Sequence, residues 1–199
     1  MLRRVAFLVG GAAVASLAFA ATIKAALGLG PLFVVQEGIA GQLDISIGRA
    51  VMIVGSCLCV IALAMREWPG VGTVVLPFLI GAMVDGVLPH TPTPGGVVLR
   101  VVVVVVSTFA MALGGALIIN SRLGAGAPDL LMLGLSRLTG VNNRSVRLAL
   151  EAGFLLLGWL LGGVVGIGSV VTGVLIGPML HFWIERLHSE PVEHEHLVV

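Results

Sequence analysis

Long uncharged runs alternate with short charged segments along the whole chain. Five runs contain no Asp, Glu, Lys or Arg, namely residues 5–23, 50–65, 68–84, 101–121 and 152–184. About 20 helical residues, rising 1.5 Å each, cross the roughly 30 Å hydrocarbon core of a bilayer. The last run would form a helix of about 50 Å, and four glycines between positions 162 and 168 interrupt it. The pattern therefore predicts six transmembrane helices, two of them in the last run.

The composition favours the same class of protein. Only 11% of the 199 residues are charged and 58% are hydrophobic, whereas soluble domains are nearer 25% charged. A soluble globule of this length could not bury so much apolar surface, so we expect an all-α integral membrane protein embedded in the lipid bilayer. The formal net charge is +1, and without a basic face the chain gives no sign of binding nucleic acid.

Arginines indicate the orientation through the positive-inside rule. With a cytoplasmic N-terminus, eight arginines fall in inside segments: Arg3, Arg4, Arg66, Arg122, Arg137, Arg144, Arg147 and Arg186. Three basic residues fall outside: Lys24, Arg49 and Arg100. We therefore expect a multi-pass protein of the bacterial plasma (inner) membrane with both termini in the cytoplasm. Residues 1–22 also fit a cleavable signal peptide. An internal repeat argues against this alternative, because it aligns the first run with a second run in the middle of the chain.

The chain matches itself when it is shifted by 96 residues. GVGTVVLPFLIGAM at 70–83 aligns with GIGSVVTGVLIGPM at 166–179, with eight identities in fourteen positions. Each repeat holds three spans, and an odd number of spans makes the two halves cross the membrane in opposite directions. We predict two inverted-topology three-helix repeats, residues 1–92 and 93–188, followed by a disordered cytoplasmic tail at 189–199.

Each repeat has a short segment interrupted by Gly and Pro after its first helix. The residues that mark the two turns are Gly28, Gly30, Pro31, Gly124, Gly126 and Pro128. Glycine permits backbone angles that other residues resist, and proline suits the first turn of a helix. The apolar stretches at 31–43 and 128–140 would reach only about 20 Å as helices. We expect each to be a short helix, either interfacial or re-entrant.

The same motifs resemble the YczE-type (YczE/YyaS/YitT-like) bacterial membrane proteins. The resemblance rests on LGLGP at 27–31, GVGT at 70–73 and LGAGAPDLLMLGLSRLTG at 123–140, and it covers about residues 4–187. It implies a multi-pass bacterial membrane protein and no defined activity. The family pattern GAGPRD reads GAGAPD at 124–129, so proline stands where the family has a basic residue, and no role of that residue carries over.

Four ionisable residues within or beside the apolar runs are candidate substrate-binding residues, because charges at membrane depth are costly. Asp129 follows the second Gly-rich turn and is either a ligand or gating residue or a helix-capping carboxylate. Arg147 and Glu151 lie four residues apart and form either a cation or proton site with its counter-charge or a neutralising pair. Glu37 is either a site residue or a water-exposed residue at the interface.

Small residues also recur on the third and sixth predicted spans. Gly81 lies on one span, and Gly173 and Gly177 lie on the other. This spacing predicts either close packing of the two spans against each other or generic close packing with another neighbour.

No catalytic constellation stands out, and no nucleotide-binding loop. We expect no enzyme, no cofactor and no metal. Inverted repeats with interrupted segments at corresponding positions are typical of transporters, which favours a small-solute transporter or channel-like permease with a small-molecule substrate. The alternative is a non-transporting scaffold or regulator of another membrane protein, since six spans with few buried charges offer little machinery for ion coupling.

Overall fold

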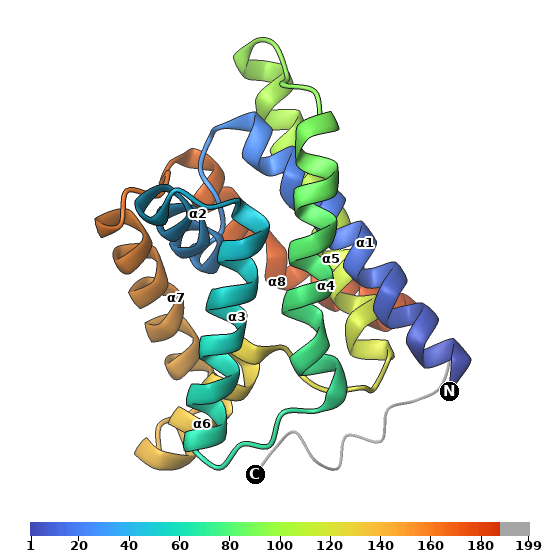
Figure 1. The fold of residues 1–199 in the computed structure, drawn as a ribbon, viewed down its shortest axis with the longest axis vertical. Helices are drawn as coiled ribbons and strands as arrows, with labels where there is room; N and C mark the ends of the chain where they lie inside the picture. The colour runs from blue at the N-terminus through green and yellow to red at the C-terminus, as the bar shows by residue number, and fades with distance from the viewer. Residues whose placement is uncertain (188–199) are drawn as a thin grey trace.

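The structure is a computed structural model that describes residues 1–187; the tail expected at 189–199 lies outside this range. Residues 1–187 form eight α-helices and one short 3-10 helix, with no strand (Figure 1). The elements are α1 (Leu2–Ala25), α2 (Pro31–Leu43), α3 (Ile47–Ala64), α4 (Val71–Val87), η1 (Leu88–His90), α5 (Val97–Asn120), α6 (Ala127–Thr139), α7 (Asn143–Leu160) and α8 (Ile167–Leu187). The prediction of an all-α protein is therefore confirmed.

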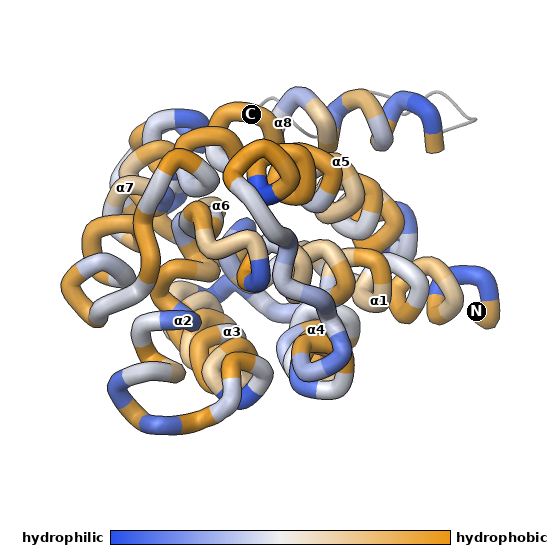
Figure 2. The backbone as a smooth tube through the Cα atoms, turned by 90° about the horizontal axis from the view of Figure 1, so that it is seen from above, coloured by the Kyte–Doolittle hydropathy of each residue, from blue (hydrophilic) through white to orange (hydrophobic). Residues whose placement is uncertain are grey.

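Five helices are long and apolar enough to cross a membrane, judged by length and composition: α1, α3, α4 with its extension to His90, α5 and α8. α7 has 18 residues as well, but three of them are charged, namely Arg144, Arg147 and Glu151. The break predicted in the last apolar run is present, since α7 ends at Leu160 and α8 begins at Ile167. Figure 2 shows that apolar residues dominate the long helices.

Local signals explain where several helices begin. Ser46 caps α3, its hydroxyl accepting a hydrogen bond from the backbone N–H of Arg49 at 3.3 Å. Asn142 caps α7 in the same way, accepting from the N–H of Ser145 at 2.8 Å. Each cap satisfies an N–H group that has no partner inside its helix. The short helices α2 and α6 carry a proline in the first turn instead, where its missing N–H costs nothing.

The long helices α1 and α5 form the centre of the bundle. They pack closely because Gly11 and Gly114 face each other: a Cβ on Gly11 would lie 2.7 Å from the Gly114 carbonyl oxygen. α4 packs on α1 and α8 packs on α5, while α2 packs on α7 and α3 on α6. Figure 2 shows α8 on the side of α5 and α7 at the opposite edge.

The helix bounds in the two halves are related by the shift seen in the sequence. α2 spans residues 31–43 and α6 spans 127–139; α3 spans 47–64 and α7 spans 143–160. Each pair of bounds differs by 96. The first residues of α4 and α8, Val71 and Ile167, differ by 96 as well.

The predicted third and sixth spans correspond to α4 and α8, and of the two alternatives for their small residues, packing of these two helices against each other is wrong. Gly81 of α4 packs against α3, where a Cβ on Gly81 would lie 2.5 Å from the Gly48 carbonyl oxygen. Gly173 and Gly177 of α8 have no neighbouring heavy atom within 4 Å of an added Cβ. A stripe of small residues permits close packing without selecting the partner helix, and α3 is the partner that α4 uses.

Candidate functional site

The short helices α2 and α6 begin inside the bundle. The ring of Phe33, in the first turn of α2, stacks on Phe19 of α1 with ring centroids 4.2 Å apart. Phe19 lies six residues before the last residue of α1, so α2 begins roughly 9 Å inside the end of α1. Figure 1 shows the chain turning back from the end of α1 toward the middle before α2 starts.

Each Gly-rich turn is held by the first turn of a long helix from the other half. The N–H of Gly168 in α8 donates to the Leu27 carbonyl at 2.7 Å, and the N–H of Gly72 in α4 donates to the Leu123 carbonyl at 2.8 Å. The Thr73 hydroxyl also donates to the Ala125 carbonyl at 2.6 Å. These bonds satisfy backbone groups that would otherwise be costly inside a bilayer.

The structure divides the four turn glycines into two kinds. Gly28 and Gly124 have φ of +105° and +141°, a region that residues with a Cβ rarely adopt. They also lie in close contact, since an added Cβ would be 2.4 Å from the Gly166 nitrogen or 2.5 Å from the Thr73 hydroxyl oxygen. Gly30 and Gly126 have ordinary φ of −61° and −59°, so the expectation of unusual backbone angles is wrong for these two.

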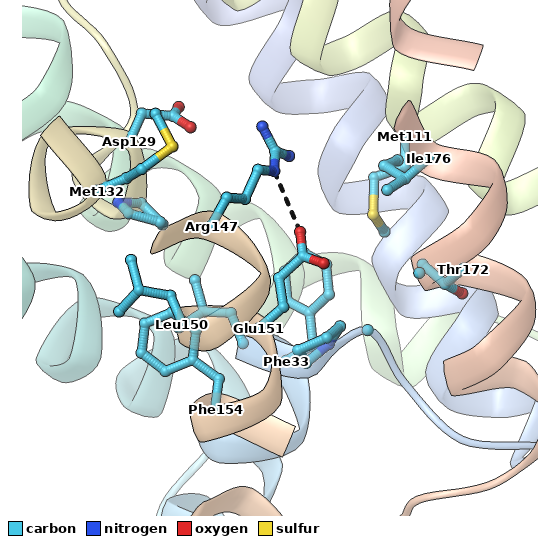
Figure 3. A pocket seen from close by; sticks show the side chains of 15 residues that line it. Phe33, Met111, Asp129, Met132, Arg147, Leu150, Glu151, Phe154, Thr172 and Ile176 are labelled. Atoms are coloured by element: carbon cyan, nitrogen blue, oxygen red, sulfur yellow. Dashed lines mark hydrogen bonds and ion pairs between the residues drawn. The ribbon is translucent and has the colours of Figure 1, made fainter. Parts of the chain in front are cut away.

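A cavity of about 200 Å³ lies where the two short helices begin (Figure 3). Residues from α2, α5, α6, α7 and α8, with the residue before α2, line it: Gly30, Pro31, Leu32, Phe33, Met111, Pro128, Asp129, Met132, Arg147, Leu150, Glu151, Phe154, Thr172, Gly173 and Ile176. The lining is mainly apolar with a few charged groups, as is usual for small-molecule sites. Both Gly/Pro-interrupted segments therefore contribute to one cavity.

Three of the four predicted site residues meet in this cavity. The Nε of Arg147 lies 3.2 Å from Oε1 of Glu151, one helical turn away on α7. Asp129 lies in the first turn of α6, and Figure 3 shows its carboxylate on the side of the cavity where the Arg147 guanidinium lies. Burial raises the pKa of Asp129, while the positive charge of Arg147 and a backbone hydrogen bond with Gly126 oppose the rise. Asp129 thus lies at the start of α6 and lines the cavity, and its role, as a ligand or gating residue or as a helix-capping carboxylate, stays a prediction.

The structure places Glu37 apart from the other three. Its Oε2 accepts a hydrogen bond from the N–H of Val164 at 2.7 Å, in the loop between α7 and α8. Burial raises the pKa of Glu37, and this hydrogen bond opposes the rise. Gln42 supports the same loop by donating to the Leu161 carbonyl at 3.2 Å. Glu37 therefore holds a loop against α2 and does not line the cavity.

The cavity is open between α7 and α8. In the first half α3 packs along α4, where Gly55 lies so close to Pro77 that an added Cβ would be 2.5 Å from the proline ring. The counterparts in the second half, 96 residues later, are Glu151 and Gly173, which face the cavity. α7 and α8 do not pack closely along each other, unlike α3 and α4.

The sequence did not single out several residues that line the cavity. Phe33, Phe154, Met111 and Met132 have apolar neighbours along the chain, and an aromatic or methionine side chain in such a stretch carries no signal that separates a cavity wall from lipid contact. Among residues 1–187, no group of three or more His, Cys, Asp or Glu side chains is placed to hold a metal ion.

Comparison with known proteins assigns the chain to a family. The profile of the family of unknown function DUF6198 matches residues 2–185. The chain belongs to this family. It is similar to the uncharacterized membrane protein YczE of Bacillus subtilis (strain 168), with 29% identity over 161 residues that cover 79% of this chain and 74% of the relative. The resemblance to YczE-type membrane proteins is thus confirmed.

A second relative is an uncharacterized protein of Haemophilus influenzae, strain Rd. It is 29% identical over 174 residues, which cover 86% of this chain and 80% of the relative. No solved structure matches the chain significantly. Membership of the family and the apolar helices together establish a multi-pass membrane protein of the YczE type.

Proposed function

We propose that this DUF6198 protein is a small-solute transporter or channel-like permease whose substrate passes through the cavity at the start of α2 and α6. One observation carries the proposal: both Gly/Pro-interrupted segments, one from each half, line the same cavity. Non-helical backbone at membrane depth is tolerated where it is enclosed by protein or lines a water-filled cavity. Transporters commonly place broken helices at such a site.

Six spans in two inverted repeats complete this architecture. The matching helix bounds in the two halves support the repeat. The hydrogen bonds at the two Gly-rich turns also support the repeat. The bond from Gly168 to Leu27 and the bond from Gly72 to Leu123 join equivalent positions of the two halves. α7 serves as the fifth of the six spans because its charged residues lie toward its first turns or face the cavity. The end that carries Met1 and the 121–126 turn lies in the cytoplasm, because the arginines gather there.

The three charged residues would bind the polar part of the substrate or the coupling ion. Arg147 offers a fork of N–H donors for a carboxylate or phosphate, and Asp129 and Glu151 offer acceptors for a cation or proton. Charged groups inside a membrane protein commonly mark such pathways. The alternative, a non-transporting scaffold, predicts that these residues serve only for folding.

Reconstituted proteoliposomes test the proposal. Charge movement would be recorded on a solid-supported membrane after concentration jumps of small cations, anions, zwitterions and protons. We expect a response to one class, lost in both Asp129→Asn and Arg147→Gln and retained in Glu185→Gln, which changes an exposed carboxylate outside the cavity. Responses that survive both substitutions, or no response to any class, would contradict transport through this cavity and favour the scaffold.

A further inference from the structure

A groove of about 370 Å³ continues from the cavity along the gap between α7 and α8. The cavity and the groove share four lining residues: Arg147, Glu151, Gly173 and Ile176. Beyond them the groove reaches Arg144, the second residue of α7, and His181 on α8. It therefore runs from the middle of the bundle toward the end at which α7 begins.

The groove exists because the second half lacks the close contacts of the first. Gly48 of α3 lies against Gly81 of α4, and its N–H donates to the Asp85 carboxylate at 2.8 Å. Arg144 stands at the position equivalent to Gly48, and its side chain is too large for the same approach. Gly177, the counterpart of Gly81, is left with open space beside it.

The two ends of the groove differ in chemistry. Its walls are apolar, with Leu148, Val174, Pro178 and Leu180 among them. At the mouth lie Arg144 and His181, and the Nε2 of His181 lies 3.2 Å from Oε1 of Glu185. The side chain of Arg144 forms no hydrogen bond or ion pair with any other residue in the described range 1–187, which leaves its guanidinium free to bind an anion.

The depth of these groups in the membrane matches the two layers of a bilayer leaflet. Arg144 is 16 residues before the outer end of α7 at Leu160, and His181 is 14 residues after the start of α8 at Ile167. At 1.5 Å per residue they lie roughly 24 Å and 21 Å from the outer ends of their helices. The hydrocarbon core is about 30 Å thick, so in the orientation proposed above Arg144 and His181 lie near the headgroups of the inner leaflet and the apolar walls lie in hydrocarbon. Trp183, two residues beyond His181, suits the same boundary.

We propose that this groove is a binding site for an anionic phospholipid, with an acyl chain along the apolar walls and the phosphate at Arg144. Space between helices in a bilayer is filled, because an empty groove would forfeit its van der Waals contacts. Basic pockets between helices at the cytoplasmic side suit anionic headgroups. The site goes beyond the proposed transport function and holds equally for a scaffold.

Native mass spectrometry of the detergent-solubilised protein tests the lipid site. Dioleoyl phosphatidylglycerol and dioleoyl phosphatidylcholine would be titrated separately, so that only the headgroup charge differs. We expect phosphatidylglycerol to bind more tightly, and Arg144→Gln to weaken its binding roughly fivefold, as the loss of one basic residue near a lipid surface predicts. Arg4→Gln is the matched control, since Arg4 is an exposed arginine at the same end of the bundle but on α1, outside the groove.

Four results would overturn the proposal. Equal binding of the two lipids would remove the role of the anionic headgroup. An equal loss in Arg4→Gln and Arg144→Gln would show general surface attraction. Full competition by free glycerol phosphate would show an anion site without an acyl chain. A lipid-free dimer that forms only while position 144 is arginine would identify a second copy of the chain as the occupant.

Discussion

Gly81 of α4 lies directly against Gly48 of α3, so that a Cβ added to either glycine would reach the carbonyl oxygen of the other at 2.5 Å or less. Their counterparts 96 residues later, Gly177 and Arg144, line an open groove. The two halves have equivalent helices, but α3 and α4 are in close contact whereas a groove separates α7 from α8.

Alanine substitutions should affect stability differently at the α3–α4 contact and at the α7–α8 groove. Gly81→Ala forces the α3 backbone away and should lower the free energy of unfolding by about 1–3 kcal/mol, as overpacking does. Gly177→Ala adds a methyl group to open space and should be neutral or stabilising by up to about 1 kcal/mol, through helix propensity. Thermal or denaturant unfolding in detergent measures both, and equal effects would contradict the asymmetry.

The turn glycines give a second prediction. Gly28→Ala and Gly124→Ala place a Cβ at a strongly positive φ and against neighbouring atoms, so each should cost about 1–3 kcal/mol. Gly10→Ala on α1 is the control, because no atom lies within 4 Å of the added Cβ. Folded yield and unfolding temperature report the result. Wild-type stability in both turn variants would show that the turns tolerate a different backbone.

Asp129 should make stability depend on pH in a particular direction. Burial raises its folded-state pKa above the unfolded value of about 3.9. The resulting stabilisation is fully present below the unfolded pKa and is lost as the pH rises through the folded pKa. Asp129→Asn should therefore gain stability relative to wild type as the pH rises from the unfolded pKa through the raised folded-state pKa. Parallel pH profiles for the two proteins would contradict this assignment.

Glu37 should protect one amide from exchange. Glu37→Ala removes the acceptor of the Val164 N–H, and a hydrogen bond to a charged group contributes about 1.5–3 kcal/mol. Hydrogen–deuterium exchange at Val164 should accelerate about tenfold or more, while Arg147→Gln, which leaves this bond intact, should not change it. Unchanged exchange in Glu37→Ala would show that the loop is held by other contacts.

Much of the fold could be predicted because membrane helices are encoded locally. Uncharged runs gave the long helices, and the glycines after Gly162 gave the break between α7 and α8. The repeat linked the two Gly-rich turns, and the cost of charge at membrane depth singled out Asp129, Arg147, Glu151 and Glu37 one by one. The structure brings the first three together.

Tertiary contacts were harder to predict for physical reasons. The small residues on α4 signal close packing without naming α3 as its partner. The sequence could not distinguish Gly28, with its positive φ, from Gly30, because both sit in one glycine-rich turn. Glu37 was grouped with the site because charge at membrane depth suggests function, yet here it bonds to the Val164 amide, a contact between residues 127 positions apart.

Access of water to the cavity tests the central claim most directly. Met132→Cys, in a background without Cys57 and Cys59, places a thiol on the cavity wall. Leu156→Cys is the control, because Leu156 is an exposed residue of α7 that lines neither the cavity nor the groove. A charged, membrane-impermeant thiol reagent added to the cytoplasmic side of sealed vesicles should label position 132 and leave the lipid-facing position 156 unlabelled. A transported solute should slow the labelling of position 132. Failure to label position 132 from either side, in a folded protein, would mean a dry seam between the two Gly-rich turns and would contradict a transport pathway there.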